Sequence, residues 1–228
     1  MHTTTKHIHD HSLVLLNDLQ MTEEKLLSFA ESLSLKKEEK ILEWNFGKVM
    51  SMKYVQNHPN YLFSQEPVPF HWDGAFFKEP SFLLFYCVSS EGEGGETLFS
   101  NTERLAKTLS KDEIQSLRET TMTYKTEKLA HYGGEVTFPA LTTHPVKGTN
   151  ILRIAEEVKS EKNPVELNIK GNSELIRKLQ QRLYEPQFCY AHQWKKGDLL
   201  LADNFSLLHG RLALGLNETR EFKRIQIM

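Results

Sequence analysis

A histidine and an aspartate stand two positions apart in the segment Pro67-Val-Pro-Phe-His71-Trp-Asp73. On an extended strand, side chains at positions i and i+2 point to the same face, so an imidazole nitrogen and a carboxylate oxygen can converge here on one ion. Among the ten histidines of the chain, only His71 is followed two positions later by an acidic residue. His71 and Asp73 are therefore predicted metal ligands, although a short His/Asp pattern also occurs as a hydrogen-bonded surface pair without a metal.

A third ligand must come from elsewhere in the chain, and His209 is the best candidate. It follows Gly197-Asp-Leu-Leu-Leu-Ala-Asp-Asn204, which predicts a turn, an apolar strand and a polar strand end. Two imidazoles and one carboxylate leave several positions of an ion open for exchangeable ligands, which is typical of oxygen-activating Fe(II) sites. A structural zinc site would need a fourth protein ligand.

Arginines follow this histidine at positions 211, 220 and 224. A planar guanidinium binds a carboxylate through two parallel hydrogen bonds, which a lysine ammonium does not. A 2-oxo acid that chelates iron at one end carries a second carboxylate at the other, and such an arginine would bind it. Arg220 and Arg224 lie four residues apart, on one side of a predicted strand. Thr97, in Gly94-Gly-Glu-Thr97, could add a hydroxyl donor to the same carboxylate.

Taken in order along the chain, the His-x-Asp pair, the Gly-Gly-Glu-Thr segment, the later histidine and the two arginines resemble the TauD/TfdA family of Fe(II)- and 2-oxoglutarate-dependent dioxygenases. The resemblance runs from about Tyr61 to the C-terminus. It implies a mainly β fold, a double-stranded β-helix (a jelly roll of the clavaminate synthase-like kind) with peripheral helices, and dioxygen as second cosubstrate. It also implies roles for five side chains: iron ligation by His71, Asp73 and His209, and binding of the distal carboxylate of 2-oxoglutarate by Thr97 and Arg220.

Within that family, Asn60-Tyr-Leu-Phe-Ser64 and Val68-Pro-Phe-His-Trp-Asp-Gly-Ala-Phe76 resemble the PvcB-type enzymes, which tailor isocyanide (isonitrile) derivatives of amino acids such as tyrosine in secondary-metabolite biosynthesis. Related halogenases replace the carboxylate ligand with a small residue, so the intact aspartate implies hydroxylation or desaturation of a small substrate. Tyr61 and Phe63 are expected at the mouth of the pocket, in contact with substrate. Arg224 matches a position that faces an anionic substrate group, and bracing of the aspartate is the alternative.

Three other functions remain open on the sequence. A taurine- or sulfonate-type dioxygenase of the same family would use the same metal ligands. A zinc hydrolase could use them with a metal-bound water, but it would need a general base and has no use for the arginine pair. A jelly-roll protein that binds a small molecule without turnover would need no metal ligands at all.

Hydrophobic periodicity predicts a few helices around a β-rich core. Thr22 is a predicted N-cap for a helix over Glu23–Leu33, Ser110 begins a capping box before a second helix, and a third is expected over Ser173–Tyr184. The first eleven residues show no apolar periodicity and are expected to form a mobile terminus or the lead-in to a strand. Short, irregularly spaced strands favour a jelly roll over alternating βαβ units; they are expected at Leu13–Leu16, Phe82–Val88, Thr97–Phe99, Met122–Tyr124, Ile151–Ile154, Phe188–Gln193, Leu199–Ala202 and Arg224–Met228.

Length and composition favour a single domain over residues 1–228. The 28 basic and 30 acidic side chains nearly balance, so no attraction to nucleic acid or to an anionic membrane is indicated. No apolar run approaches the roughly 20 residues of a membrane span, and a soluble, cytoplasmic protein with a small-molecule substrate is expected. Cys87 and Cys189 lack CxxC spacing and are expected to be buried, inert thiols; His144 is expected to be structural. A homo-oligomer is left open, because a second subunit could complete the substrate lid.

Overall fold

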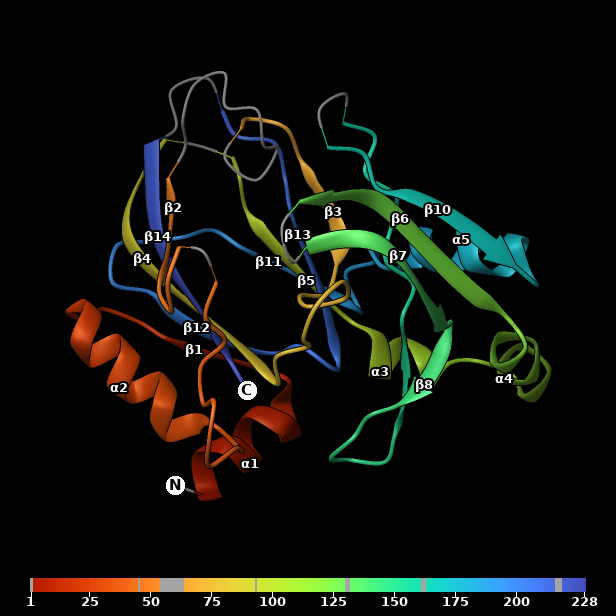
Figure 1. The fold of residues 1–228 in the computed structure, drawn as a ribbon, viewed down its shortest axis with the longest axis horizontal. Coiled ribbons are helices and arrows are strands. Elements are labelled where there is room, and N and C mark those ends of the chain that lie inside the picture. Colours follow the sequence, from red (N-terminus) through yellow and green to blue (C-terminus); the bar gives the residue numbers. More distant parts are fainter. Residues whose placement is uncertain are drawn as a thin grey trace.

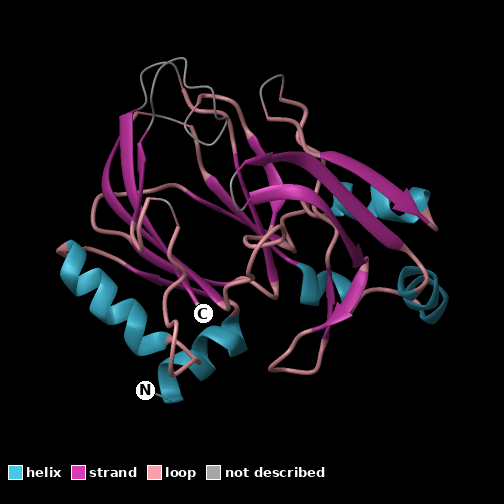
Figure 2. Ribbon diagram, viewed as in Figure 1, coloured by secondary structure: helices cyan, strands magenta, loops and turns pink. Residues whose placement is uncertain are grey.

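The structure of the chain, a computed structural model, describes residues 2–44, 46–53, 64–92, 94–129, 132–160, 163–215 and 219–228. Strands form its central part and the helices lie around them (Figure 1, Figure 2). Tyr61 and Phe63, the two residues expected at the pocket mouth, lie outside the described residues.

Two antiparallel sheets form a jelly roll. From β2 to β5, and again from β11 to β14, successive strands alternate between the two sheets, which is the connectivity of a double-stranded β-helix. One sheet contains, in spatial order, β1 (Leu13–Leu16), β12 (Leu199–Asp203), β4 (Phe82–Glu91), β14 (Thr219–Ile227) and β2 (Met50–Lys53). The other contains β11 (Cys189–His192), β5 (Thr97–Asn101), β13 (Leu207–Arg211) and β3 (Val68–His71). The fold expected from the resemblance is thereby confirmed.

In the described part of the chain, two smaller sheets and five helices surround the jelly roll. A three-stranded sheet pairs β10 (Glu166–Lys170), β6 (Thr121–Leu129) and β7 (Tyr132–Pro139), and a two-stranded sheet pairs β8 (Leu141–Thr143) with β9 (Asn150–Leu152). The helices are α1 (His2–His11), α2 (Glu23–Leu33), α3 (Thr102–Ala106), α4 (Lys111–Arg118) and α5 (Ser173–Arg182). In Figure 1, α1 and α2 lie beside the five-stranded sheet, whereas α4 and α5 lie on the side of the three-stranded sheet.

The alternation of side chains along β14 shows how the jelly roll divides its core. Ile225 and Ile227 point outward and pack against α2. Phe222 points inward, into an apolar cluster between the two main sheets that includes Phe85, Phe99 and Trp194. Because successive side chains on a strand point to opposite faces, Arg220, Arg224 and Gln226 share the inward face with Phe222. A third cluster joins the four-stranded sheet to the three-stranded sheet and α5.

The predicted helices mostly agree with the observed ones. The Thr22 hydroxyl accepts a hydrogen bond from the backbone of Lys25, and α2 has the predicted bounds. Ser110 forms the predicted capping box at the start of α4. Helix α5 ends at Arg182 rather than Tyr184, because its last turn tightens.

The first eleven residues do lead into the predicted strand, β1 (Leu13–Leu16), but the alternative of a mobile terminus was wrong, because residues 2–11 form α1. Ile8 of this helix is fully buried, and His9 contacts the carboxylate of Asp203 in the core. Tertiary contacts therefore stabilise a helix whose own sequence has little periodicity.

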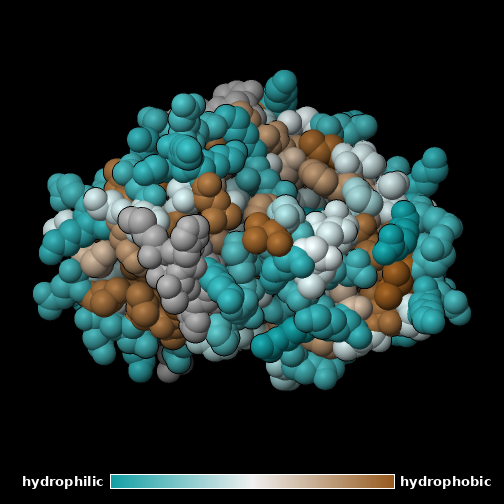
Figure 3. All heavy atoms as spheres, turned by 90° about the horizontal axis from the view of Figure 1, so that it is seen from below, coloured by the Kyte–Doolittle hydropathy of each residue, from teal (hydrophilic) through white to brown (hydrophobic). Residues whose placement is uncertain are grey.

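The surface has mixed polarity. Within the described ranges, none of the helices has the length and apolar character that crossing a membrane requires. On the face shown in Figure 3, hydrophilic residues predominate and hydrophobic residues form separate patches. Cys87 is a buried free thiol, as expected, whereas Cys189 is free but only partly buried. Burial raises the pKa of the Cys87 thiol to about 12, so this group is inert at neutral pH.

Candidate metal centre and cosubstrate cavity

The first two predicted ligands lie where β3 ends. His71 is the last residue of the strand, and Asp73 begins the turn that follows it rather than continuing the strand. Gly74 continues this turn with φ +89°, and a Cβ atom there would lie 2.1 Å from the carbonyl oxygen of Lys78, so only glycine fits. Trp72 points away from the site into the core, as the alternation predicts.

The third predicted ligand comes from the adjacent strand. His209 of β13 is directly opposite His71 of β3 in the antiparallel register. The two strands approach closely at Gly210, where a Cβ atom would lie 2.7 Å from the carbonyl oxygen of Val68. Nε2 of His71 and Nε2 of His209 each lie 3.8 Å from Oδ1 of Asp73. The three candidate ligand atoms lie within 4.8 Å of one another.

The protonation of these side chains suits a cation. Nδ1 of His71 lies 2.9 Å from the carbonyl oxygen of Pro69, which can only accept, so Nε2 carries the lone pair. Burial lowers the pKa of His71, and burial together with His71 lowers the pKa of His209 to about 3. Burial would raise the pKa of Asp73, but the positive charge of Arg224, the two imidazoles and a hydrogen bond from Gln226 outweigh it and lower the pKa to about 2. At neutral pH the site therefore holds a carboxylate and two neutral imidazoles.

The donor set fits an Fe(II) ion. Two atoms bound to one ion at about 2.1 Å can lie no more than about 4.2 Å apart, and the 3.8 Å that separates Oδ1 of Asp73 from Nε2 of each histidine falls within that limit. Two imidazole nitrogens and one carboxylate oxygen are also the donors that non-haem Fe(II) oxygenases use.

Three side chains hold Asp73 in place. Asn204 binds its backbone on both sides: the Asp73 amide donates to Oδ1 of Asn204 at 3.0 Å, and Nδ2 of Asn204 donates to the Asp73 carbonyl at 3.0 Å. Gln226 and Arg224 contact Oδ2 of the carboxylate at 2.6 Å and 3.4 Å. Sequence reasoning missed Asn204 and Gln226. Asn204 could have been found as a polar residue at the end of a predicted apolar strand. Gln226 could have been found because it lies two residues after Arg224, on the same face of a predicted strand.

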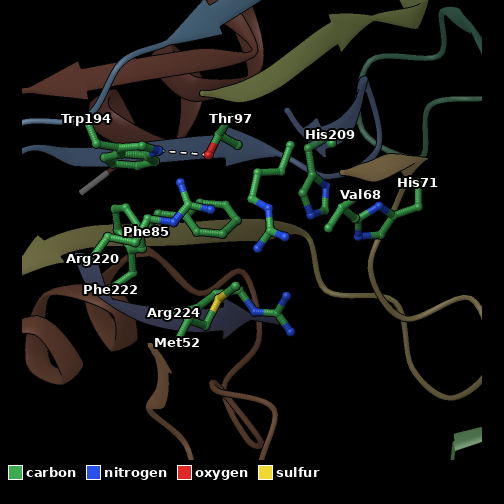
Figure 4. A pocket seen from close by; sticks show the side chains of 12 residues that line it. Met52, Val68, His71, Phe85, Thr97, Trp194, His209, Arg220, Phe222 and Arg224 are labelled. Carbon is green, nitrogen blue, oxygen red and sulfur yellow. Dashed lines mark hydrogen bonds between the residues drawn. The ribbon is translucent and has the colours of Figure 1, made fainter. Parts of the chain in front are cut away.

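A cavity of about 480 Å³, including the part open to solvent, lies beside the candidate ligands. The cavity is lined by Met52, Val68, His71, Phe85, Thr97, Trp194, His209, Gly210, Arg211, Arg220, Phe222 and Arg224. Both predicted arginines of β14 thus face one cavity, as their spacing indicated. Figure 4 shows the guanidinium of Arg220 near Phe85 and the Thr97–Trp194 pair, and that of Arg224 farther along, on the side of the histidines.

Several polar groups that line this cavity already form hydrogen bonds within the protein. The Thr97 hydroxyl accepts a hydrogen bond of 2.8 Å from the Trp194 indole, so its own proton can be donated elsewhere. Arg220 donates to the carbonyl of Gly95, and its guanidinium lies 5.2 Å from the ring of Phe222. Arg211 donates to the backbone carbonyls of Ser64 and Glu66, so it ties the segment before β3 to β13.

A second cluster of His9, His144 and Asp203 is structural. Nδ1 of His144 accepts from the backbone amides of Val146 and Lys147, so Nε2 carries the proton that it shares with Asp203 at 2.9 Å. Nζ of Lys147 lies 3.6 Å from the same carboxylate and would repel a cation. The predicted structural role of His144 is confirmed.

A double-stranded β-helix in which two imidazoles and one carboxylate meet beside an arginine-lined cavity defines a class of protein, the Fe(II)- and 2-oxoglutarate-dependent oxygenases. A family model described as "Taurine catabolism dioxygenase TauD, TfdA family" matches residues 1–226, and the chain belongs to this family.

Relatives and solved structures agree with this assignment. The chain is 38% identical over 231 residues to 3-((Z)-2-isocyanoethenyl)-1H-indole synthase of Fischerella ambigua, covering 96% of this chain and 83% of that protein. It is 33% identical over 199 residues to tyrosine isonitrile desaturase of Pseudomonas aeruginosa, covering 82% and 68%. The crystal structure of PvcB from Pseudomonas aeruginosa matches with a TM-score of 0.80 and 28% identity, covering 99% of this chain and 79% of that one.

A further PvcB structure, described as an Fe, alpha-ketoglutarate dependent oxygenase from an isonitrile synthetic pathway, matches with a TM-score of 0.79 and 27% identity over 99% of this chain and 79% of that one. The chain is therefore a dioxygenase that depends on Fe(II) and 2-oxoglutarate. The two alternatives outside the family, a zinc hydrolase and a non-catalytic binding protein, have no support.

Proposed function

We propose that this dioxygenase hydroxylates or desaturates an isonitrile derivative of an aromatic amino acid, with iron held by His71, Asp73 and His209. The observation that carries the proposal is the placement of three candidate donor atoms within 4.8 Å of one another, next to a cavity that Arg220 and Arg224 line. When bound, Fe(II) with 2-oxoglutarate and dioxygen supplies the oxidising power that removes hydrogen from an unactivated carbon.

Thr97 and Arg220 bind the distal carboxylate of 2-oxoglutarate in this proposal. Two observations support these roles. Both side chains line the same cavity, and the Thr97 hydroxyl, which accepts from Trp194, can still donate its own proton. Phe85, Phe222 and Trp194 line the same cavity. These rings exclude water, and a guanidinium–carboxylate contact is stronger where water is excluded.

The substrate proposal rests on the relatives and on Arg224. The name of one relative describes an isocyanoethenyl indole, and that of another describes desaturation of tyrosine isonitrile. Arg224 lines the cavity on the side of the histidines, where its guanidinium would bind the substrate carboxylate and fix the carbon that is oxidised (Figure 4). The intact Asp73 supports hydroxylation or desaturation over halogenation.

We further propose that the 228 residues form one dioxygenase domain, which the match over residues 1–226 supports. The contacts of Tyr61 and Phe63 with substrate, the cytoplasmic location and a homo-oligomer stay predictions.

The proposal is tested by turnover of the purified protein with Fe(II), ascorbate and 2-oxoglutarate. Tyrosine isonitrile, tryptophan isonitrile and taurine are offered separately, and succinate and the oxidised product are followed by mass spectrometry. We expect substrate-dependent succinate with an isonitrile, accompanied by gain of an oxygen atom for hydroxylation or loss of hydrogen for desaturation. Turnover of taurine with neither isonitrile consumed would overturn the substrate assignment.

A further inference from the structure

The side chain of Gln226 connects the candidate ligand Asp73 to a distant tryptophan. Gln226 is 4% exposed and lies on the inward face of β14, two residues beyond Arg224. Its Nε2 atom donates to Oδ2 of Asp73 at 2.6 Å, and its Oε1 atom accepts a hydrogen bond from the indole of Trp44. Strand β14 lies between β4 and β2, so its backbone is held on both sides.

The two contacts dictate which way the amide points. An indole N–H can only donate and an ionised carboxylate can only accept. A flipped amide would place its NH₂ group against the indole N–H and its oxygen against the carboxylate, losing both hydrogen bonds. A glutamate at this position would lack the donor when ionised, and a leucine would lack both groups. Gln226 therefore matches its two partners in only one orientation.

The two oxygens of the Asp73 carboxylate have different neighbours. Oδ2 of Asp73 faces Gln226 and Arg224, whereas Oδ1 lies 3.8 Å from the Nε2 atoms of both His71 and His209. Asn204 fixes the backbone of Asp73 but makes no contact with its carboxylate among the described hydrogen bonds. Rotation of the carboxylate is thus opposed from the Oδ2 side.

We propose that Gln226 is a positioning residue: it holds Asp73 so that a single oxygen, Oδ1, is presented to the metal, and Trp44 orients the amide that does so. The inference rests on the proposed function, since it takes Asp73 as a ligand. A carboxylate that binds through one oxygen occupies one position of the ion and leaves the rest for exchangeable ligands. The ring centroid of Trp44 lies 5.4 Å from that of Phe77, which follows the turn that carries Asp73. The side chain of Trp44 is therefore itself held by packing.

The test measures Co(II) binding to the 228-residue apoprotein, because the visible spectrum of Co(II) reports the number and arrangement of its ligands. Gln226→Leu should weaken Co(II) binding about 10- to 100-fold, as is typical when a partner of a metal ligand is lost, and should change the spectrum. Trp44→Phe, which frees the amide to rotate, should weaken binding about two- to tenfold. Lys223→Met is the matched control: it removes a side chain of the same strand that contacts Ser51 and Glu23, away from the site, and should change neither readout.

Thermal unfolding establishes that each variant is folded. Wild-type affinity and spectrum in folded Gln226→Leu overturn the inference, while loss of binding in Asp73→Ala keeps the ligand assignment intact. If Gln226→Leu fails to fold, Trp44→Phe decides, and a wild-type affinity and spectrum there overturn the inference. Wild-type Co(II) binding by Asp73→Ala would instead overturn the proposed metal site itself.

Discussion

The guanidinium of Arg224 lies 3.4 Å from Oδ2 of Asp73. The sequence left two roles for this arginine, recognition of a substrate carboxylate and bracing of Asp73, and the ion pair is the contact that bracing would use. Arg224 also lines the cavity, so substrate binding remains compatible with its position.

Replacement of Arg224 by glutamine separates these roles. Because Gln226 still donates to Oδ2 in this variant, we expect Fe(II) and 2-oxoglutarate affinities within about threefold of wild type. Substrate affinity should fall at least about tenfold, since a charge-assisted hydrogen bond contributes roughly 1.5–3 kcal/mol. The variant should bind a methyl ester of the substrate no more weakly than it binds the acid. Failure to bind iron, or equal handling of acid and ester by wild type, would assign Arg224 to bracing alone.

Removal of the candidate carboxylate ligand should abolish iron binding and succinate formation together. Asp73→Ala takes away the only carboxylate in the His71–Asp73–His209 cluster. The measurements are metal content after reconstitution with Fe(II) and succinate release. Glu221→Gln, a change on β14 at a partly exposed position that contacts Lys53, serves as control. Wild-type iron content in Asp73→Ala would show that the ligand assignment is wrong.

Arg220→Ala should weaken 2-oxoglutarate binding by at least about tenfold, because a charge-assisted hydrogen bond of roughly 1.5–3 kcal/mol is lost. Thr97→Val removes a neutral donor and should cost less, about two- to tenfold. Titration of the anaerobic Fe(II) protein with 2-oxoglutarate measures both. If Arg220→Ala binds 2-oxoglutarate with wild-type affinity, the distal carboxylate is bound by Arg211 or Arg224 instead.

The stability of the chain should depend on pH through Asp203. Burial would raise the pKa of this carboxyl, but hydrogen bonds from His144 and His9 and the charge of Lys147 outweigh it and hold the pKa well below its usual range. A carboxyl with a depressed folded pKa contributes its stability above the unfolded value of about 3.9, and the contribution is lost as pH falls toward the folded value.

Asp203→Asn should therefore lower the free energy of unfolding by about 2–3 kcal/mol near neutral pH, and the difference from wild type should shrink below about pH 4. Urea unfolding of both proteins across this range measures it. A difference that stays constant or grows on acidification below that point would contradict the assignment.

The sequence by itself determined the elements whose signal is local. Thr22 and Ser110 cap their helices through side chains only three residues from their partners, and apolar stretches such as that in β12 form strands because they can be buried on both faces. The His-x-Asp pair likewise brings two donors together over a very short separation. Residue type and position also made His209, Thr97 and Arg220 candidates, and the resemblance to the family assigned each of them a role.

Only the tertiary structure decided which distant groups meet. The pairing of β13 with β3 sets His209 opposite His71, and the central position of β14 brings Gln226 to the carboxylate of Asp73. Helix α1 is stabilised by burial of Ile8 and by the contact of His9 with Asp203, neither of which leaves a periodic pattern in the sequence. Such contacts depend on strand register and burial between residues far apart in the chain, and local propensity carries no information about either.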